Sequence, residues 1–306
     1  MKKILLCIVL LLAASAIPSK AEDGASLAIN FQQEVDRRLD VPQVAQARYV
    51  ELLEAALSKA EILISTAQYI LVVDRNPHVQ AIFLYWLDPH APLHRYHFIG
   101  ASPVSTGRPG EFDHFITPLG VFKKTLEYND YRAEGTLNGY GIRGLGRKGM
   151  RVFDFGWVQA EQGWGPGRLN QMRLLLHATD PDKLEIYLGK VKSKGCVRIP
   201  TTLDNFIDRY GLLDADYEQA LEISKKFWVL RPDRTPTPWS SRYLVIVDSD
   251  SYSRPEWSPE PVAVTKKPKS RKTPKQSSVH GSTNSAPTQE SFGIKLRRVP
   301  AIEVGQ

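Results

Sequence analysis

The chain has 306 residues and a formal net charge of +7, from 40 Lys and Arg against 33 Asp and Glu, with only two cysteines. This length suits one catalytic domain with appendages rather than several large domains. Residues 1–21 carry a charge of +3 and residues 253–306 carry +6, which leaves −2 for residues 22–252. The basic character therefore belongs to the ends of the chain and gives no basis for a nucleic-acid-binding core.

The first residues predict export. A charged start, Met1-Lys2-Lys3, precedes an apolar run from residue 4 to residue 14, as in a secretory signal. The run is too short to span a bilayer, which takes ~20 residues. Small residues at 14–16 and 19–21 offer two cleavage sites. We therefore expect a signal peptide at 1–21 and a periplasmic protein, for which nucleic acid is not an expected partner.

Export leaves one cysteine. Cys7 lies inside the apolar run and is removed with the signal, so the mature chain keeps only Cys196. Cysteines of exported proteins usually occur in pairs. Without a partner in its own chain, Cys196 is either a buried, inert thiol or a nucleophile.

Residues 22–66 are predicted to form an N-terminal helical segment, with helix over 27–60 and Pro42 at a first helical position. Apolar residues recur there at helical spacing and predict one packing face: Val44, Ala47, Val50, Leu53, Ala56 and Leu57.

Residues 67–250 change to short β-branched and aromatic runs separated by Gly, Pro and Asp. We expect strands at 69–73, 80–87, 95–99, 121–122, 151–155 and 243–247. Many short strands with turn signals predict a mainly β fold, a β-sandwich or a partly closed barrel.

Two further motifs are weighed against simpler interpretations. Residues 139–144 match a dinucleotide-binding fingerprint, but the glycines continue to residue 149 and would not tolerate the helix that the motif needs. A mobile loop near the substrate groove is the better interpretation. His90, His94 and His97 have a spacing that zinc could use, but no cysteine or carboxylate cluster accompanies them. We therefore expect no cofactor and no metal.

The stretch from 172 to 200 carries the chemistry. Leu174 to Leu176 predict a buried strand that ends at His177, and Gly195 permits a tight turn before Cys196. A thiol needs a nearby base to act as a nucleophile, and His177 is the nearest candidate in sequence. The backbone N–H groups of Gly195 and Cys196 could stabilise an oxyanion. Together these features indicate acyl transfer.

Three segments resemble the L,D-transpeptidase catalytic domain (YkuD-type). They are His177 with the Ser193-Lys-Gly-Cys-Val-Arg198 segment, the Ser-Thr-Gly segment within 103–110, and the Thr-Pro-x-Gly-x-Phe segment at 117–122. The resemblance covers roughly residues 67–212. The chain departs from the family at Lys194, where His is usual, and at Ala178, where Gly or Ser is commoner.

The resemblance implies a fold with short helices after the cysteine, at 202–210 and 215–226. It also implies a donor, the tetrapeptide stem of peptidoglycan. Cys196 would attack the carbonyl of the third residue and release D-alanine, with His177 as base, and an amine would accept the acyl group. The backbone carbonyl of Ala178 would orient the imidazole, with Asp180 as the alternative.

The remaining candidates concern substrate binding. Arg198 has a guanidinium suited to a stem-peptide carboxylate, or else it forms a structural ion pair. Lys194 would favour a thiolate or bind a carboxylate. Ser193 and Thr117 are expected close to the site, and His114 either lines the groove or caps a turn.

Residues 251–306 are rich in Pro, Ser, Thr and Lys and are predicted to be a disordered tail. The basic run 266–275 could adhere to an anionic surface of the membrane or cell wall, or remain solvated without a partner.

Three other functions stay open. They are an L,D-carboxypeptidase or other cell-wall cysteine hydrolase on the same fold, a non-catalytic wall-binding module, and a scaffold that acts through its tail.

Overall fold

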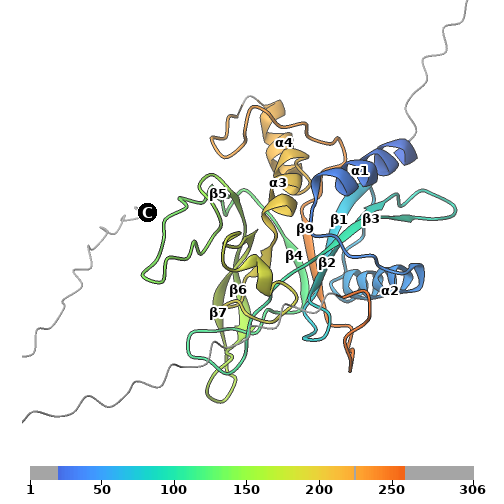
Figure 1. Ribbon diagram of the computed structural model, residues 1–306. Coiled ribbons are helices and arrows are strands. Elements are labelled where there is room, and N and C mark those ends of the chain that lie inside the picture. Colours follow the sequence, from blue (N-terminus) through green and yellow to red (C-terminus); the bar gives the residue numbers. More distant parts are fainter. Residues whose placement is uncertain (1–19, 224, 259–306) are drawn as a thin grey trace, which may run out of the picture. The chain divides into compact units, whose positions relative to one another are not determined.

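Two β-sheets and four α-helices make up the computed structural model, which describes residues 20–223 and 225–258 (Figure 1). All of them belong to one compact unit of the chain. The helices are α1 (Lys20–Glu34), α2 (Gln43–Lys59), α3 (Thr201–Arg209) and α4 (Ala215–Glu222), with one 3₁₀ turn at Glu185–Tyr187. The strands are β1 (Gln68–Asp74), β2 (Ala81–Leu87), β3 (Tyr96–Pro103), β4 (Gly120–Lys123), β5 (Tyr131–Arg132), β6 (Arg151–Glu161), β7 (Leu169–Ala178), β8 (Val197–Ile199) and β9 (Tyr243–Val247).

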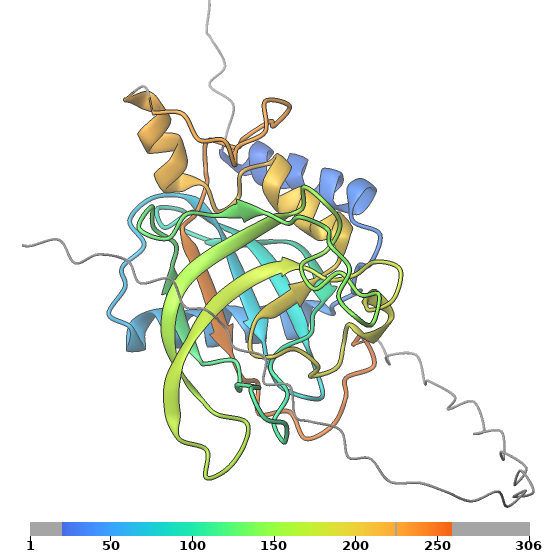
Figure 2. The ribbon, with the colours of Figure 1, turned by 90° about the vertical axis from the view of Figure 1, so that its left-hand side faces the viewer.

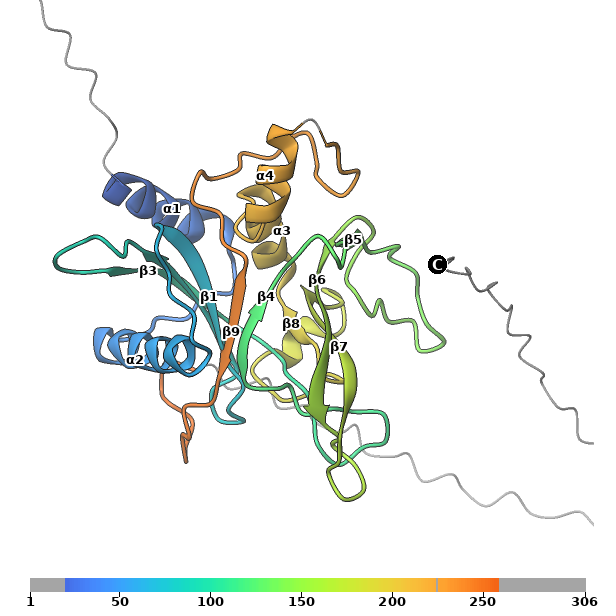
Figure 3. The same cartoon turned by 180° about the vertical axis from the view of Figure 1, so that it is seen from behind.

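Both sheets are mixed. The first has the order β3-β2-β1-β9-β4, in which β9 lies between β1 and β4 and runs parallel to β1 (Figure 3). The second has the order β5-β6-β7-β8, with β8 parallel to β7. In the described part of the chain the two sheets do not join into a closed barrel, and the fold is mainly β as predicted. Single bridges, Ser105 to Arg198 and Gly107 to Ser193, connect the segment after β3 with the second sheet.

The first sheet is covered on both faces, which explains why its central strands are continuous apolar runs. Every residue of β1 and of β2 is buried. Successive residues of a strand point to opposite faces, and accordingly Leu71 packs in the core shared with the second sheet, while Val72 packs in the core beneath α2. The site therefore rests on a rigid two-layer support.

The two N-terminal helices pack on opposite faces of the first sheet, α1 in the core that the two sheets share and α2 in the core on the other face. Helix α1 packs on β3, where a Cβ on Gly100 would collide with the Phe31 ring. Helix α2 packs through a buried stripe of Tyr49, Leu53 and Leu57. These residues are four apart and so share one helix face.

The prediction of one helical stretch over 27–60 is wrong between the helices. Residues 35–42 are not helical, and Leu39 donates its N–H to the carbonyl of Ala101. Pro42 is the residue before helix α2 rather than its first residue. Val44, expected on the packing face, is 80% exposed, because Tyr49 begins the stripe that contacts the sheet.

The strands predicted from sequence are all present, and β3, β6 and β7 extend several residues further than expected. β6 and β7 form one long hairpin, the curved yellow-green arm in Figure 2. The helices expected after the cysteine occur as α3 and α4, and α4 ends at Glu222 rather than at 226.

Both predicted terminal segments lie largely outside the described residues, namely the signal peptide apart from residues 20–21 and the tail beyond residue 258. Residues 251–258, assigned to the tail from sequence, pack on the body. The Trp257 ring meets the rings of Tyr49 and Phe83, and Ser258 donates a hydrogen bond to the carbonyl of Val79. None of the described helices is long and apolar enough to cross a membrane.

Candidate active site

The parallel pairing of β7 with β8 brings the histidine and the cysteine to one face of the second sheet. In this register Leu176 pairs with Val197, and His177 pairs with Arg198. Leu176 and Val197 are fully buried in the core. Strand alternation therefore places His177, Arg198 and, by extension, Cys196 on the opposite face.

The His177 ring is held as a neutral base. It is 3% exposed, and its Nδ1 lies 2.7 Å from the carbonyl oxygen of Ala178. A carbonyl can only accept, so Nδ1 carries the proton and Nε2 is left with its lone pair. Burial, aided by the Arg198 charge, lowers the His177 pKa to about 4, against the effect of the Ala178 bond. Asp180, the alternative orienting group, instead accepts the backbone N–H groups of Arg143 and Asp182.

Cys196 lies at the start of β8 and is partly exposed. Its Sγ is 3.7 Å from the carbonyl oxygen of Arg173, and among the described residues it makes no hydrogen bond to His177. Burial raises the pKa of the thiol, although backbone hydrogen bonding with Leu175 and the charge of Arg198 act in the opposite direction. The thiol is therefore protonated at rest.

Lys194 does not stabilise the thiolate as expected from the sequence. Its ammonium nitrogen is 2.7 Å from an Asp113 carboxylate oxygen, and both side chains are 60% exposed. The lysine therefore forms a surface ion pair.

Ser193 and Thr117 hold the turn before the cysteine. Ser193 Oγ donates to the carbonyl of Cys196 (2.6 Å) and accepts the N–H of Gly195 (3.0 Å). Thr117 Oγ1 donates to the carbonyl of Gly195 at 2.6 Å. Gly195 has φ +130°, a conformation that favours glycine, and a Cβ there would meet Met172. Since the Gly195 N–H is already bonded, only the N–H of Cys196 remains of the two expected oxyanion donors.

His114 matches the turn interpretation. Its Nδ1 is 3.0 Å from the carbonyl oxygen of Phe112, and its Nε2 is 3.5 Å from the Glu111 carboxylate. These contacts are within its own loop.

Arg198 forms a wall of a cavity of about 250 Å³ whose lining also includes Thr179, two residues after His177. Its guanidinium has no carboxylate partner in the described part of the chain, and Nη1 makes one long bond, 3.4 Å, to the carbonyl of Lys192. The structural ion pair considered for Arg198 is therefore not formed.

Asp204 of α3 is a site residue that the sequence reasoning missed. Its two carboxyl oxygens accept the backbone N–H of Ala178 (3.1 Å) and of Arg151 (3.2 Å). In the β6–β7 register Val152 lies opposite His177, so Arg151 and Ala178 are the next pair of opposed residues. Asp204 thus closes the end of the ladder and holds the backbone N–H of Ala178, the residue whose carbonyl in turn holds the His177 ring. In the sequence, Asp204 is marked only as an acidic residue next to the apolar residues of a predicted helix.

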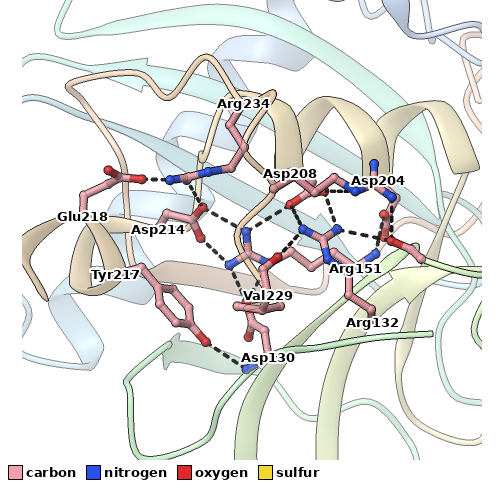
Figure 4. A network of polar contacts seen from close by, with 12 residues as sticks. Asp130, Arg132, Arg151, Asp204, Asp208, Asp214, Tyr217, Glu218, Val229 and Arg234 are labelled. Atoms are coloured by element: carbon pink, nitrogen blue, oxygen red, sulfur yellow. Dashed lines mark hydrogen bonds and ion pairs between the residues drawn. The ribbon is translucent and has the colours of Figure 1, made fainter. Parts of the chain in front are cut away.

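A buried ion network supports the same end of β6 (Figure 4). The Arg151 side chain is fully buried and binds three carboxylates: Asp130 and Asp214 at 2.7 and 2.5 Å, and Asp208 at 3.1 Å. Because Asp208 belongs to α3, the network ties that helix, and with it Asp204, to the second sheet.

Cofactor and metal candidates do not form sites in the described residues. No group of three or more His, Cys, Asp or Glu side chains there could hold a metal ion. Of the three histidines considered, His90 contacts the carbonyl of Ser65 and His97 stacks on Trp86. The glycine-rich stretch 139–149 contains no helix.

Comparison with protein-family models gave no match, and a search of curated proteins gave none either.

Proposed function

We propose that this chain is a cysteine acyltransferase of the L,D-transpeptidase type that acts on peptidoglycan stem peptides in the periplasm. The observation that carries the proposal is the tautomer of His177. Its Nδ1 is hydrogen-bonded to the carbonyl of Ala178, which leaves Nε2 free to accept a proton. His177 lies on β7, which pairs with β8, the strand that follows Cys196. A base with a fixed tautomer beside a thiol is the arrangement required for nucleophilic catalysis.

The specific fold assignment belongs to the same proposal. The described chain has two mixed sheets, helices after the cysteine, and N-terminal helices that pack on the first sheet. These features agree with the expected β-rich domain with appendages. The resemblance in the three motif segments supplies the family and the substrate class.

The reaction follows from the residues in place. When a stem peptide binds, the thiol turns from the Arg173 carbonyl towards His177 and gives its proton to Nε2. The sulfur of Cys196 then forms a bond to the carbonyl carbon of the third residue, and the backbone N–H of Cys196 stabilises the oxyanion. His177 returns the proton to the leaving D-alanine nitrogen as the C–N bond breaks.

The second half repeats these steps with an acceptor. An amine attacks the thioester and loses a proton to Nε2 of His177, and Cys196 leaves as a thiol once it regains that proton.

Mass spectrometry of the products formed from a defined tetrapeptide tests the proposal. The unaltered protein should form an intact-mass adduct on Cys196 and then 3→3 cross-linked dimers. Cys196→Ser and His177→Gln should each lower the rate by about 10²–10⁴-fold, the usual contribution of such groups. The double variant should lose little more than either single variant, because the two residues act as one unit.

Circular dichroism of each variant provides the control for folding. Near-parental cross-linking or D-alanine release by a folded Cys196→Ser protein would refute the proposal. Release of D-alanine without cross-links would identify water as the acceptor and replace the transferase by the carboxypeptidase alternative.

A further inference from the structure

The cavity beside Arg198 concentrates positive charge. Its lining includes Arg108, Lys192 and Arg198, and no Asp or Glu of the described chain. Arg108 pairs with Glu111 outside the cavity, and the Lys192 ammonium lies 4.1 Å from the centre of the Tyr187 ring. All three cations are partly exposed, and Glu111 already compensates Arg108. The positive charge that no carboxylate of the lining neutralises therefore lies at Lys192 and Arg198.

Three polar atoms of the lining are buried and have no hydrogen-bond partner: Nε of Arg108, Nε of Arg198 and Oγ1 of Thr179. Thr179 is 1% exposed, so water does not reach its hydroxyl from the surface. A buried donor without a partner costs about 1–3 kcal/mol. Two guanidinium groups and a hydroxyl match the two oxygens of a carboxylate.

The cavity lining includes residues two positions from the cysteine and from the histidine. Arg198 follows Cys196 by two positions on the same strand face, which corresponds to roughly 7 Å. Thr179 follows His177 by two positions on the neighbouring strand. A carboxylate bound between them would belong to the residue under attack or to the next residue of the same peptide.

We propose that Arg108, Lys192, Arg198 and Thr179 form a carboxylate subsite that selects the donor peptide. This inference rests on the proposed acyltransferase function and names the group that the site recognises. Two carboxylates of the donor share this chemistry: the terminal carboxylate of the leaving D-alanine, and the side-chain carboxylate of the third residue.

Three donors distinguish these sources. They are the free-acid tetrapeptide, the same peptide ending in D-alaninamide, and the same peptide with the side-chain carboxyl of its third residue amidated. With the unaltered protein, one of the two amidated donors should show a kcat/KM about tenfold or more below that of the free acid, as expected for the loss of one charge-assisted contact.

In Arg108→Gln and Thr179→Val this discrimination should fall towards unity, mainly through a higher KM for the free acid. Glu111→Gln is the matched control, since it removes the ion pair of Arg108 without altering the cavity lining, and it should retain the discrimination. Equal kcat/KM values for all three donors, or unchanged discrimination in both cavity variants, would overturn the subsite.

A binding measurement separates this inference from the proposed function. The Cys196→Ser protein is titrated with D-alanine and with D-alaninamide if the leaving residue is selected, or with the two forms of the third residue otherwise. The Arg108 and Arg198 Nε–H signals in ¹H–¹⁵N spectra should shift only with the acid. Shifts with the acid but no turnover of any donor would retain the subsite and reject the transpeptidase. Turnover of a donor without any shift of these signals would reject the subsite and retain the transpeptidase.

Discussion

Replacing Asp204 by Asn tests how the strand end that carries His177 is held. Both carboxyl oxygens accept backbone N–H groups, from Ala178 and Arg151. An amide keeps one acceptor oxygen and presents an NH₂ group to the other donor. One buried N–H then loses its partner, at a cost of about 1–3 kcal/mol. Asp204→Asn should therefore be less stable than the parent by this amount at pH 5, where the Asp204 carboxyl is neutral.

The stability difference should depend on pH. Burial, aided by the charge of Asp208, raises the pKa of Asp204 to about 8. Between the unfolded pKa of about 3.9 and the folded pKa, the native state binds more protons than the unfolded state, so stability falls as pH rises. For one proton the slope is about 1.4 kcal/mol per pH unit, or about 4 kcal/mol between pH 5 and pH 8. Asn cannot ionise, so the variant should lose less stability over this range and match or exceed the parent at pH 8.

Urea unfolding at pH 5, 6, 7 and 8, followed by circular dichroism, measures both effects. Asp233→Asn, which changes an exposed acid, is the matched control and should follow the parent at every pH. Parallel stability curves for the parent and Asp204→Asn would refute the assignment of the titration to this residue. In the proposed reaction the variant should also lower kcat with little change in KM, because Ala178, whose carbonyl orients His177, is less firmly held at its N–H.

Four further outcomes are expected. Arg151→Leu removes the buried cation that three carboxylates share, although each keeps another partner, Lys124, Arg132 or Arg234, and it should lower the free energy of unfolding by about 3–5 kcal/mol, visible as a lower urea midpoint. The acid limb of kcat/KM should lie near pH 4, because burial lowers the pKa of His177 to about 4 and only the neutral ring accepts a proton; a limb near 6.5 would contradict this. Lys194→Ala should change kcat/KM less than about twofold, because its ammonium pairs with Asp113 at the surface; a tenfold loss would mean that it reaches the substrate. Deleting residues 259–306 should leave turnover of soluble peptides unchanged but weaken binding to sacculi at low salt, and equal binding would reject adhesion through the tail.

The strands could be predicted because their signal is local. The run from Tyr69 to Val73 is apolar throughout, as expected for a strand buried on both faces, and it forms β1. The break between α1 and α2 could not be predicted in the same way. Leu39 and Val41 are apolar, as helix positions often are, but here they bury against the body in an extended segment. That outcome depends on β3, which is distant in sequence.

The proposed site and its surroundings show the same division. His177 and Cys196 were predicted from their spacing and from the strand and turn that precede them. The roles of Lys194 and Asp204 depend on partners far along the chain: Asp113 for the first, Arg151 and Ala178 for the second. Sequence can indicate that such a residue is polar, but not which group it meets in the folded chain.

The resting site disfavours charge on both members of the pair. Burial raises the pKa of Cys196 and lowers that of His177, so each group favours its neutral form. A thiolate–imidazolium pair is then most favourable when a substrate carbonyl is in position to receive the developing negative charge. Thiol oxidation proceeds through the thiolate. In the proposed function, a nucleophile that stays protonated until its substrate binds would be protected from oxidation in the periplasm, and the described chain has no second cysteine to form a disulfide with it.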